Sequence, residues 1–412
     1  MSETTGWPAN RTSRREFIRS AAFGISALVT PSLLVTHNEA AAAEDRSEEA
    51  LATADVDALH RRVRAELKVF TDWLAENGVK GYIGEVGWPD DVRGDYTRWN
   101  ALAEAWFEDA DAAGLWVTVW ATGQWWKHPY YPLAVYENRL PGPGVDTANT
   151  QAPVVEAHPT TESYLRGVCV AGAEFGTPGP LVKRSRFSNA RPGVYDTAYH
   201  YDSQETFTYL AGRGIQLVRL AFRWERLQRT LGGELNTAEL ERLKGAVARA
   251  RNAGLDVLLD MHGYGAYQLS NGTRGIRRAI GSAQVTHAHF ADVWRRISAA
   301  FKEDPGVIGY GIMNEPVAMP SSASLSATEG WELASQEALD AIRGSDDTKL
   351  VTISGYEWAG VQEWPKQHPD KWITDDANNH RYEGHHYWDR DNSGEYSHSY
   401  AEEVANAQSR GY

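Results

Sequence analysis

Short, nearly continuous apolar runs recur along the chain from Gly81 onward, and a polar cluster follows most of them. Runs of this kind are typical of strands that are covered on both faces, as in a parallel sheet beneath helices. The pattern predicts eight strands, at residues 81–86, 116–121, 167–171, 217–222, 257–261, 307–313, 350–354 and 382–387.

Apolar positions at helical spacing lie between most of these runs. Before the first strand, Val56, Leu59, Val63 and Leu67 follow the helical repeat, and Gly78 is a suitable residue to end the helix. Further helices are predicted at residues 96–113, 205–212, 236–253, 286–301 and 328–344. Eight alternating units predict an α/β protein with a single (β/α)8 TIM barrel rather than two doubly wound domains.

The first 43 residues have the pattern of an export signal. Arg14 and Arg15 precede an apolar run at residues 21–35, and Ala40–Ala43 form a small-residue cleavage zone. This resembles a twin-arginine signal and predicts a secreted or periplasmic protein whose catalytic barrel occupies residues 44–412. The apolar run has about 15 residues, fewer than the roughly 20 that span a bilayer, so no stable membrane insertion is expected after cleavage. An uncleaved membrane anchor is the alternative.

Charge and composition narrow the classes of partner. The 412 residues include 41 Lys+Arg and 55 Asp+Glu, and the net charge of −14 is spread along the chain, which argues against nucleic acid. An uncharged substrate suits this acidic chain better than a polyanion does. The single cysteine, Cys169, excludes an intramolecular disulfide and Cys-based zinc sites. Sixteen Trp and 19 Tyr provide flat rings that stack on sugars, although aromatic residues also fill cores.

Polar residues stand at the carboxyl ends of the predicted strands, where a TIM barrel has its active site. A buried core would not contain such groups unless they converge on something polar. In chain order these residues are Glu85, Trp120, Glu174, Arg219, His262, Tyr264, Asn314, Glu315, Glu357, Trp358, His385 and Tyr387.

Two of these residues, Glu85 and Glu315, each follow an apolar strand within a short motif, Gly84-Glu85-Val86-Gly87 and Asn314-Glu315-Pro316. Glycoside hydrolysis requires two opposed carboxylates, one as acid and base and the other as nucleophile or base. Each motif alone could instead be a hydrogen-bonding group at a strand end. Their occurrence together on eight strands favours catalysis.

The whole set of motifs resembles glycoside hydrolase family 5, a retaining family that includes many cellulases and mannanases. The resemblance covers most of the chain after the signal. In the family's strand order it rests on Gly172–Gly176, Val218-Arg219-Leu220, Leu259–Tyr264, Met313–Pro316, Tyr382–Tyr387, Gly84–Gly87 and Val119-Trp120-Ala121.

The resemblance implies a role for each catalytic residue. Glu315 would be the general acid and base, and Glu85 the nucleophile, kept ionised by Arg219. Asn314 would hold the sugar 2-hydroxyl, and Tyr387 would donate a hydrogen bond to the nucleophile.

Other residues would position the substrate. His262 and His385 would orient the sugar and the acid/base, and Trp120 would form the floor beneath the cleaved sugar. Further candidates for subsites are Tyr264, Glu174, Trp358 and Trp88. No cofactor and no metal are expected, because His385 and His386 are adjacent in a strand and point to opposite faces.

The order of the motifs departs from the family, because its seventh and eighth strands come first here and strands one to six follow. We therefore expect a circular permutant, with a joining linker at about residues 140–162 and an eighth helix reduced to about residues 150–157. The alternative is a truncated family member with an unrelated N-terminal segment, which would lack two strands and the nucleophile.

The favoured function is a retaining endo-β-1,4-glucanase that acts on a β-linked oligo- or polysaccharide. A β-mannanase or an exo-acting β-glycosidase would use the same chemistry and differ in subsite shape. A non-catalytic glycan-binding barrel is a third hypothesis, disfavoured because binding alone does not need both glutamates with Arg219 and Asn314. Nothing in the sequence decides the oligomeric state, for which a monomer is favoured.

Overall fold

The computed structural model describes residues 56–127 and 131–412. The predicted export signal and its cleavage zone lie outside these residues. Among the helices that the structure describes, none is both long and apolar enough to cross a membrane.

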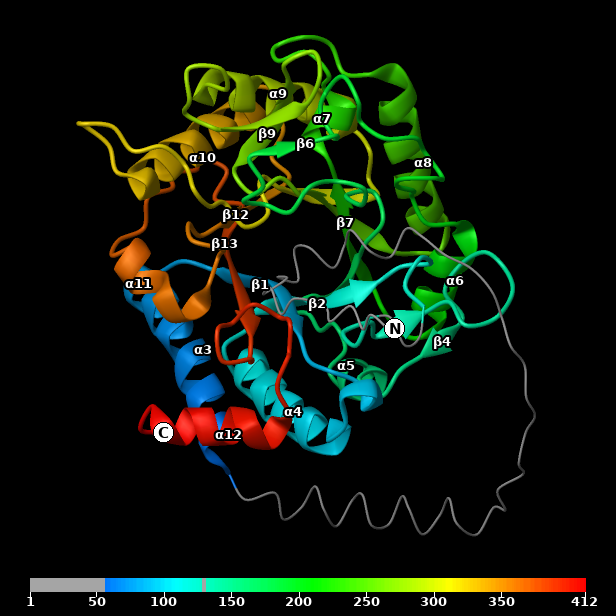
Figure 1. The fold of residues 1–412 in the computed structure, drawn as a ribbon, viewed down its shortest axis with the longest axis vertical. Coiled ribbons are helices and arrows are strands. Elements are labelled where there is room, and N and C mark those ends of the chain that lie inside the picture. Colours follow the sequence, from blue (N-terminus) through cyan, green and yellow to red (C-terminus); the bar gives the residue numbers. More distant parts are fainter. Residues whose placement is uncertain (1–55, 128–130) are drawn as a thin grey trace, which may run out of the picture.

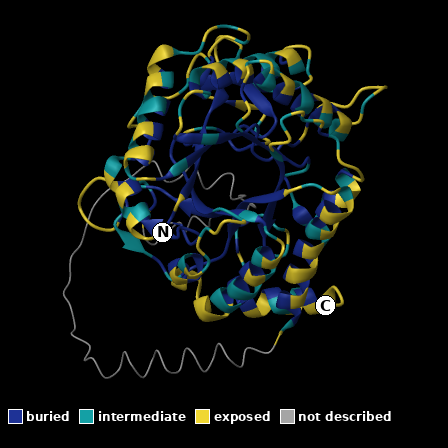
Figure 2. Ribbon diagram, turned by 180° about the vertical axis from the view of Figure 1, so that it is seen from behind, coloured by how far each residue is buried: buried dark blue, intermediate teal, exposed yellow. Residues whose placement is uncertain are grey.

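A closed barrel of eight parallel strands forms the centre of the described chain (Figures 1 and 2). Each strand pairs with the next barrel strand along the chain, and the last pairs with the first. All eight predicted strands are present, so the prediction of a (β/α)8 barrel is confirmed. They are β1 (Gly81–Gly87), β2 (Trp116–Thr122), β5 (Arg166–Val170), β7 (Leu217–Phe222), β8 (Asp256–Met261), β11 (Val307–Gly311), β12 (Leu350–Ser354) and β13 (His380–Tyr387).

Helices cover the outside of the barrel. The long ones are α3 (Ala58–Asn77), α4 (Tyr96–Ala112), α6 (Gln204–Gly212), α8 (Thr237–Asn252), α9 (His287–Phe301), α10 (Ala327–Arg343) and α12 (Tyr400–Ser409). Two connections carry only a short helix, α5 (Ala152–Ala157) after β2 and α11 (Trp364–Gln367) after β12. The short α5 lies where the reduced eighth helix was expected, and the predicted linker contains it together with β4 (Thr147–Ala148).

Smaller elements lie in the loops that follow the carboxyl ends of the barrel strands. A three-stranded sheet is built from β6 (Arg184–Ser185), β9 (Ala266–Ser270) and β10 (Gly275–Ala279), in the order β6-β10-β9. The remaining elements are β3 (Tyr136–Glu137), α7 (Trp224–Leu227), and the 3-10 turns η1 (Asp91–Arg93) and η2 (Val361–Glu363).

The strands are apolar because both of their faces are buried, and Figure 2 shows exposed positions mainly on the outer helices and loops.

Where the barrel closes, α3 packs directly on β1 and β13. The Phe70 ring lies over Gly81 and Gly384, where an added Cβ would stand 3.2 and 3.4 Å from its Cε1. The same ring contacts Trp364, with centroids 4.5 Å apart. The first and last barrel strands are thus joined through one helix.

We expect Phe70→Ala to lower the free energy of unfolding by about 3–5 kcal/mol, because it removes a fully buried ring from this junction. Urea denaturation followed by tryptophan fluorescence measures the change. The control is Glu76→Ala on the exposed face of the same helix, which should change stability little. A loss at Phe70 no larger than at Glu76 would contradict the packing described for the barrel junction.

Candidate active site

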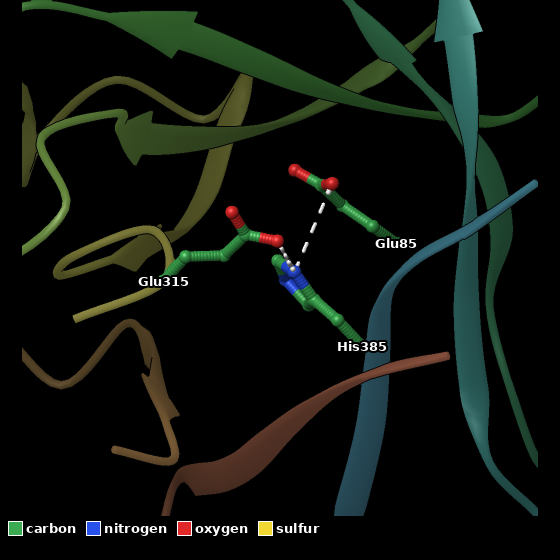
Figure 3. Close-up of side chains that lie close together, drawn as sticks. All are labelled: Glu85, Glu315 and His385. Carbon is green, nitrogen blue, oxygen red and sulfur yellow. Dashed lines mark hydrogen bonds and ion pairs between the residues drawn. The ribbon is translucent and has the colours of Figure 1, made fainter. Parts of the chain in front are cut away.

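Three buried side chains meet at the carboxyl ends of the strands: Glu85 from β1, Glu315 from the loop after β11, and His385 from β13 (Figure 3). His385 Nδ1 lies 3.0 Å from Glu315 Oε1 and 3.7 Å from Glu85 Oε2. One oxygen of each glutamate and one nitrogen of the histidine lie within 4.8 Å of one another. The structure therefore brings together two carboxylates that the chain separates by more than half its length.

Glu85 is fully buried and has two donors on its carboxylate. Arg219 Nη1 donates to Oε1 at 3.1 Å, and the Tyr387 hydroxyl donates to Oε2 at 2.7 Å. A cation and a hydroxyl donor both favour the ionised form of a carboxyl group. The surroundings of Glu85 thus suit a group that must act as an anion.

Arg219 is the centre of the polar network inside the barrel. Its Nη2 donates to Asp260 Oδ1 at 2.9 Å, to Asn314 Oδ1 at 2.7 Å and to Glu383 Oε1 at 2.8 Å. Burial acts to lower the pKa of the guanidinium. The carboxylates of Asp260, Glu383 and Glu85 outweigh this effect and raise that pKa above its usual value. Arg219 therefore stays charged and ties side chains of β1, β8, β13 and the end of β11 to one point.

Sequence analysis did not single out Asp260 and Glu383 as site residues. Both stand two positions before a predicted histidine, and alternate residues of a strand share a face. The alternation of residues along each strand could therefore have identified them, because Asp260 and Glu383 share a strand face with His262 and His385. Burial acts to raise the pKa of Glu383, but Arg219 and His385 outweigh it and hold that pKa below its usual value.

His385 carries a positive charge at neutral pH. Burial acts to lower its pKa, but Glu85, Glu315 and Glu383 outweigh this effect and raise the pKa to about 9. The protonated ring donates from Nδ1 to Glu315 at 3.0 Å and from Nε2 to Glu383 at 3.2 Å. The ring is consequently fixed between two carboxylates.

The His262 ring stacks on the ring of Trp120, with centroids 5.6 Å apart. Its Nδ1 is 3.0 Å from Asp260 Oδ2, and its Nε2 is 3.0 Å from the hydroxyl of Tyr264 and 3.2 Å from Asn314 Nδ2. The structure thus joins His262, Tyr264 and Asn314 in one chain of hydrogen bonds that leads back to Arg219.

The predicted subsite residues have different surroundings. Trp358 lines a cavity of about 710 Å³ together with Glu315, His385 and Tyr387. Glu174 is 2% exposed, and burial raises its pKa. Its Oε2 accepts a hydrogen bond from the Gly172 backbone, whereas Oε1 is buried and has no hydrogen-bond partner among the described residues.

Trp88 does not reach this cavity, which corrects the expectation of a subsite. Its side chain is fully buried and stacks on Trp388, with centroids 5.5 Å apart, while its Nε1 donates to Asn100. Trp88 directly follows β1, and its contacts with Asn100 and Phe107 place its side chain against α4 rather than in the barrel interior.

Glu85, Glu315 and His385 also form a set of possible metal ligands, because their donor atoms lie so close together. Arg219 already pairs with Glu85 at 3.1 Å, and a metal ion bound here would have to displace the proton that the surrounding glutamates favour on His385.

We expect Arg219→Met to lower the stability by about 3–5 kcal/mol at about pH 7, since it leaves buried carboxylates without their cation. Without Arg219 the pKa of Glu383 rises, and protonation then relieves the cost. The deficit should therefore be smaller at about pH 5 than at about pH 7. Urea unfolding at both pH values measures it.

Arg213→Met is the matched control, because Arg213 pairs with Glu156 at the surface, at 2.7 Å, and should contribute less than about 1 kcal/mol. Equal deficits of the Arg219 variant at the two pH values would contradict the role given to this cation.

Comparison with curated proteins finds fungal endoglucanases. The chain is 28% identical over 275 residues to the manganese dependent endoglucanase Eg5A of Phanerodontia chrysosporium, covering 65% of this chain and 63% of that protein. It is 26% identical over 226 residues to endo-beta-1,4-glucanase B of Aspergillus niger, covering 54% and 59%. The chain thus spans less than two thirds of the length of these relatives.

Solved structures with similarity include bacterial endoglucanases. One is Pseudomonas stutzeri endoglucanase Cel5A in complex with cellobiose, at 38% identity and a TM-score of 0.47, covering 56% of this chain and 62% of that one. Another is endo-beta-1,4-glucanase Xac0029 of Xanthomonas axonopodis pv. citri, at 31% identity and a TM-score of 0.47, covering 59% and 72%.

The cellulase family model, described as glycosyl hydrolase family 5, matches residues 182–410, which is more than half of the chain. The matched segment contains Arg219, His262, Asn314, Glu315 and His385. The chain therefore belongs to the cellulase family, glycosyl hydrolase family 5.

Proposed function

We propose that this protein is a retaining endo-β-1,4-glucanase. The observation that carries the proposal is the pair of buried carboxylates, Glu85 and Glu315, with oxygens within 4.8 Å of each other. Retaining glycosidases have carboxyl groups about 5–5.5 Å apart, whereas inverting enzymes need roughly 6.5–9.5 Å to fit a water molecule. The close pair supports attack by a carboxylate rather than by water.

Glu85 is the nucleophile in this proposal, and Glu315 the acid and base. Glu315 gives its proton to the glycosidic oxygen while Glu85 attacks the anomeric carbon, forming a glycosyl ester and releasing the leaving sugar as an alcohol. Glu315 then takes a proton from water, which attacks the ester and frees Glu85.

The proton that Glu315 needs can come from His385. A protonated histidine beside a carboxylate holds the same number of protons as a neutral histidine beside a carboxylic acid. A proton that moves along the hydrogen bond between His385 Nδ1 and Glu315 Oε1, at 3.0 Å, converts one form into the other. The site therefore keeps an acidic proton next to Glu315 while Arg219 keeps Glu85 anionic.

Asn314, His262 and Trp120 hold the sugar in this proposal. The hydrogen bond that Asn314 Oδ1 accepts from Arg219 orients its amide group, whose Nδ2 is the group able to donate toward a sugar hydroxyl. Trp120 and the stacked His262 give the sugar a flat aromatic support.

We propose a β-1,4-glucan as the substrate, on the strength of the endoglucanase names of the relatives. The catalytic residues do not distinguish glucan from mannan or endo from exo action, because subsite shape decides both. Hydrolysis of β-glucan, mannan, xylan and aryl glycosides, compared side by side, tests this assignment.

We propose further that the chain is a circular permutant and is exported through a twin-arginine signal. The family model begins at residue 182, whereas Glu85 and Trp120 precede it on β1 and β2. In the closed barrel these two strands stand between β13 and β5, where they complete the site. This supports an exchange of the family's strand order, with the roles of the residues kept.

A slow substrate, an activated 2-fluoro cellobioside, should accumulate as an ester on Glu85. Trypsin cleaves after Lys80 and Arg93, so mass spectrometry should find the label on the peptide Gly81–Arg93, with Glu85 as its only glutamate. The Glu85→Gln variant is the control and should stay unlabelled. A label on Glu174, Glu357 or any other residue after Arg166 would overturn both the nucleophile and the permuted order.

Glu315→Gln should lower kcat on cello-oligosaccharides by about 10²–10⁴, because the departing sugar needs a proton. On aryl glycosides with good leaving groups, bond cleavage to form the ester should lose far less, measured by the burst of released phenol. Glu357→Gln is the matched control, since Glu357 lines the same cavity, and its kcat should stay close to that of the natural enzyme. Equal losses on both substrate types would exclude Glu315 as the acid.

A further inference from the structure

Two segments of this acidic chain contain basic residues and no acidic ones. Residues 175–195 and 261–291 hold seven lysines and arginines and no Asp or Glu, although the whole chain has a net charge of −14. The seven are Lys183, Arg184, Arg186, Arg191, Arg274, Arg277 and Arg278.

The fold joins these two segments in the small sheet of β6, β9 and β10, which with its flanking loops is called the basic rim sheet (Figure 1). Arg184 of β6 is the antiparallel partner of Ile276 in β10. Partners in register share a face, and so does the residue two positions along, so Arg184 and Arg278 lie on the same face of the sheet. Arg186 and Arg274 are exposed next to the ends of these strands.

The cations of the basic rim sheet lack carboxylate partners. In the described part of the chain, Lys183, Arg184, Arg186, Arg274 and Arg278 form no ion pair, and Arg278 Nε makes no hydrogen bond. Several surface arginines elsewhere do pair with carboxylates, for example Arg64 with Asp109 at 2.6 Å and Arg213 with Glu156 at 2.7 Å. The positive charge of these side chains is therefore not compensated by nearby ion pairs and creates a local positive potential.

The loops that carry these charges are held firmly. Buried Arg226 donates to the backbone carbonyls of Ala173, Phe175 and Pro192. Arg191 Nη1 donates to the Thr273 carbonyl at 2.6 Å and so links the two segments. A hollow of about 480 Å³ lies on this surface, lined by Arg186 and Arg191 among others. The backbone that carries the cations is therefore held in place, which lowers the entropy lost when the surface binds an anion.

The basic rim sheet is attached to the candidate active site through Arg277. Its Nη2 donates to the carbonyls of Tyr264 and Val317 at 3.0 and 2.7 Å, and Nη1 to that of Ala318 at 3.1 Å. Tyr264 in turn reaches His262 through its hydroxyl. A polymer that occupies the site therefore has the basic surface beside it.

We propose that the basic rim sheet binds an acidic polysaccharide, one that carries carboxylate groups along its chain. Guanidinium groups pair with carboxylates through two parallel hydrogen bonds, which suits uronate-like groups. Nucleic acid is disfavoured because proteins that bind single strands use exposed aromatic rings, whereas Phe187 and Tyr267 of this surface are buried. That the bound polymer neighbours the substrate rests on the proposed function; the binding itself does not.

The test is a binding titration with polygalacturonate, a carboxylated α-linked polymer, so that binding is measured without cleavage of a β-glycan. Hydroxyethyl cellulose serves as the neutral polymer. We expect binding to polygalacturonate at about 20 mM salt that weakens strongly at about 300 mM, where the screening length falls below about 10 Å.

The variant Arg184→Gln/Arg186→Gln/Arg274→Gln should bind polygalacturonate about tenfold less tightly, because it removes three exposed pairs that together contribute about 1.4 kcal/mol. The control, Arg61→Gln/Lys80→Gln/Arg251→Gln, removes three exposed charges that also lack an ion pair in the described part of the chain but lie outside the basic rim sheet, and it should bind as the natural chain does.

Equal weakening by both triple variants would overturn the proposal, as would binding of double-stranded DNA or phosphatidylserine vesicles as tight as that of polygalacturonate. Hydrolysis of hydroxyethyl cellulose is assayed separately. If the natural chain hydrolyses the β-glycan but does not bind polygalacturonate, the proposal for the basic rim sheet alone is refuted. If it binds polygalacturonate but hydrolyses no β-glycan, the proposed function alone is refuted.

Discussion

The charged fork of Arg219 holds the carboxyl-terminal end of the barrel together. One guanidinium, buried to 1% exposure, reaches Glu85, Asp260, Asn314 and Glu383. A lysine could not serve in its place, because only the planar fork presents several donors in fixed directions. Buried carboxylates are tolerated only when they are paired, so the acid groups of the site depend on this cation for the stability of the fold as well as for their ionisation.

Arg219 and His385 pair with the buried carboxylates of Glu85, Asp260, Glu315 and Glu383, which outnumber these two cations. A surplus of negative charge in a poorly solvated space favours retention of a proton, and His385 and Glu315 are the groups placed to share it. The histidine therefore links the two opposite needs of the proposed chemistry, one carboxyl group protonated and the other ionised.

Much of this arrangement could be predicted from the sequence, because a strand buried on both faces leaves a continuous apolar run and its polar end residues stand out. Asp260 and Glu383 escaped notice because their partner, Arg219, comes from another strand, and one strand's pattern does not reveal it. Trp88 is predicted in the cleft because it follows a strand, but its ring packs on Trp388 and on Phe107 of α4 instead. The net charge of the whole chain did not indicate the basic rim sheet, because a sum over all charged residues does not show where positive and negative residues cluster on the surface.

The pairing of β1 with β13 has a consequence for how the protein is made. Glu85 belongs to the first barrel strand to leave the ribosome, whereas His385 and Tyr387 belong to the last. The donors that complete the Glu85 and Glu315 pair are absent until synthesis of the barrel is nearly finished. An incomplete chain, or one that has lost its final strand to a protease, therefore carries both glutamates and still lacks the assembled centre, so the proposed chemistry requires β13 to be in place.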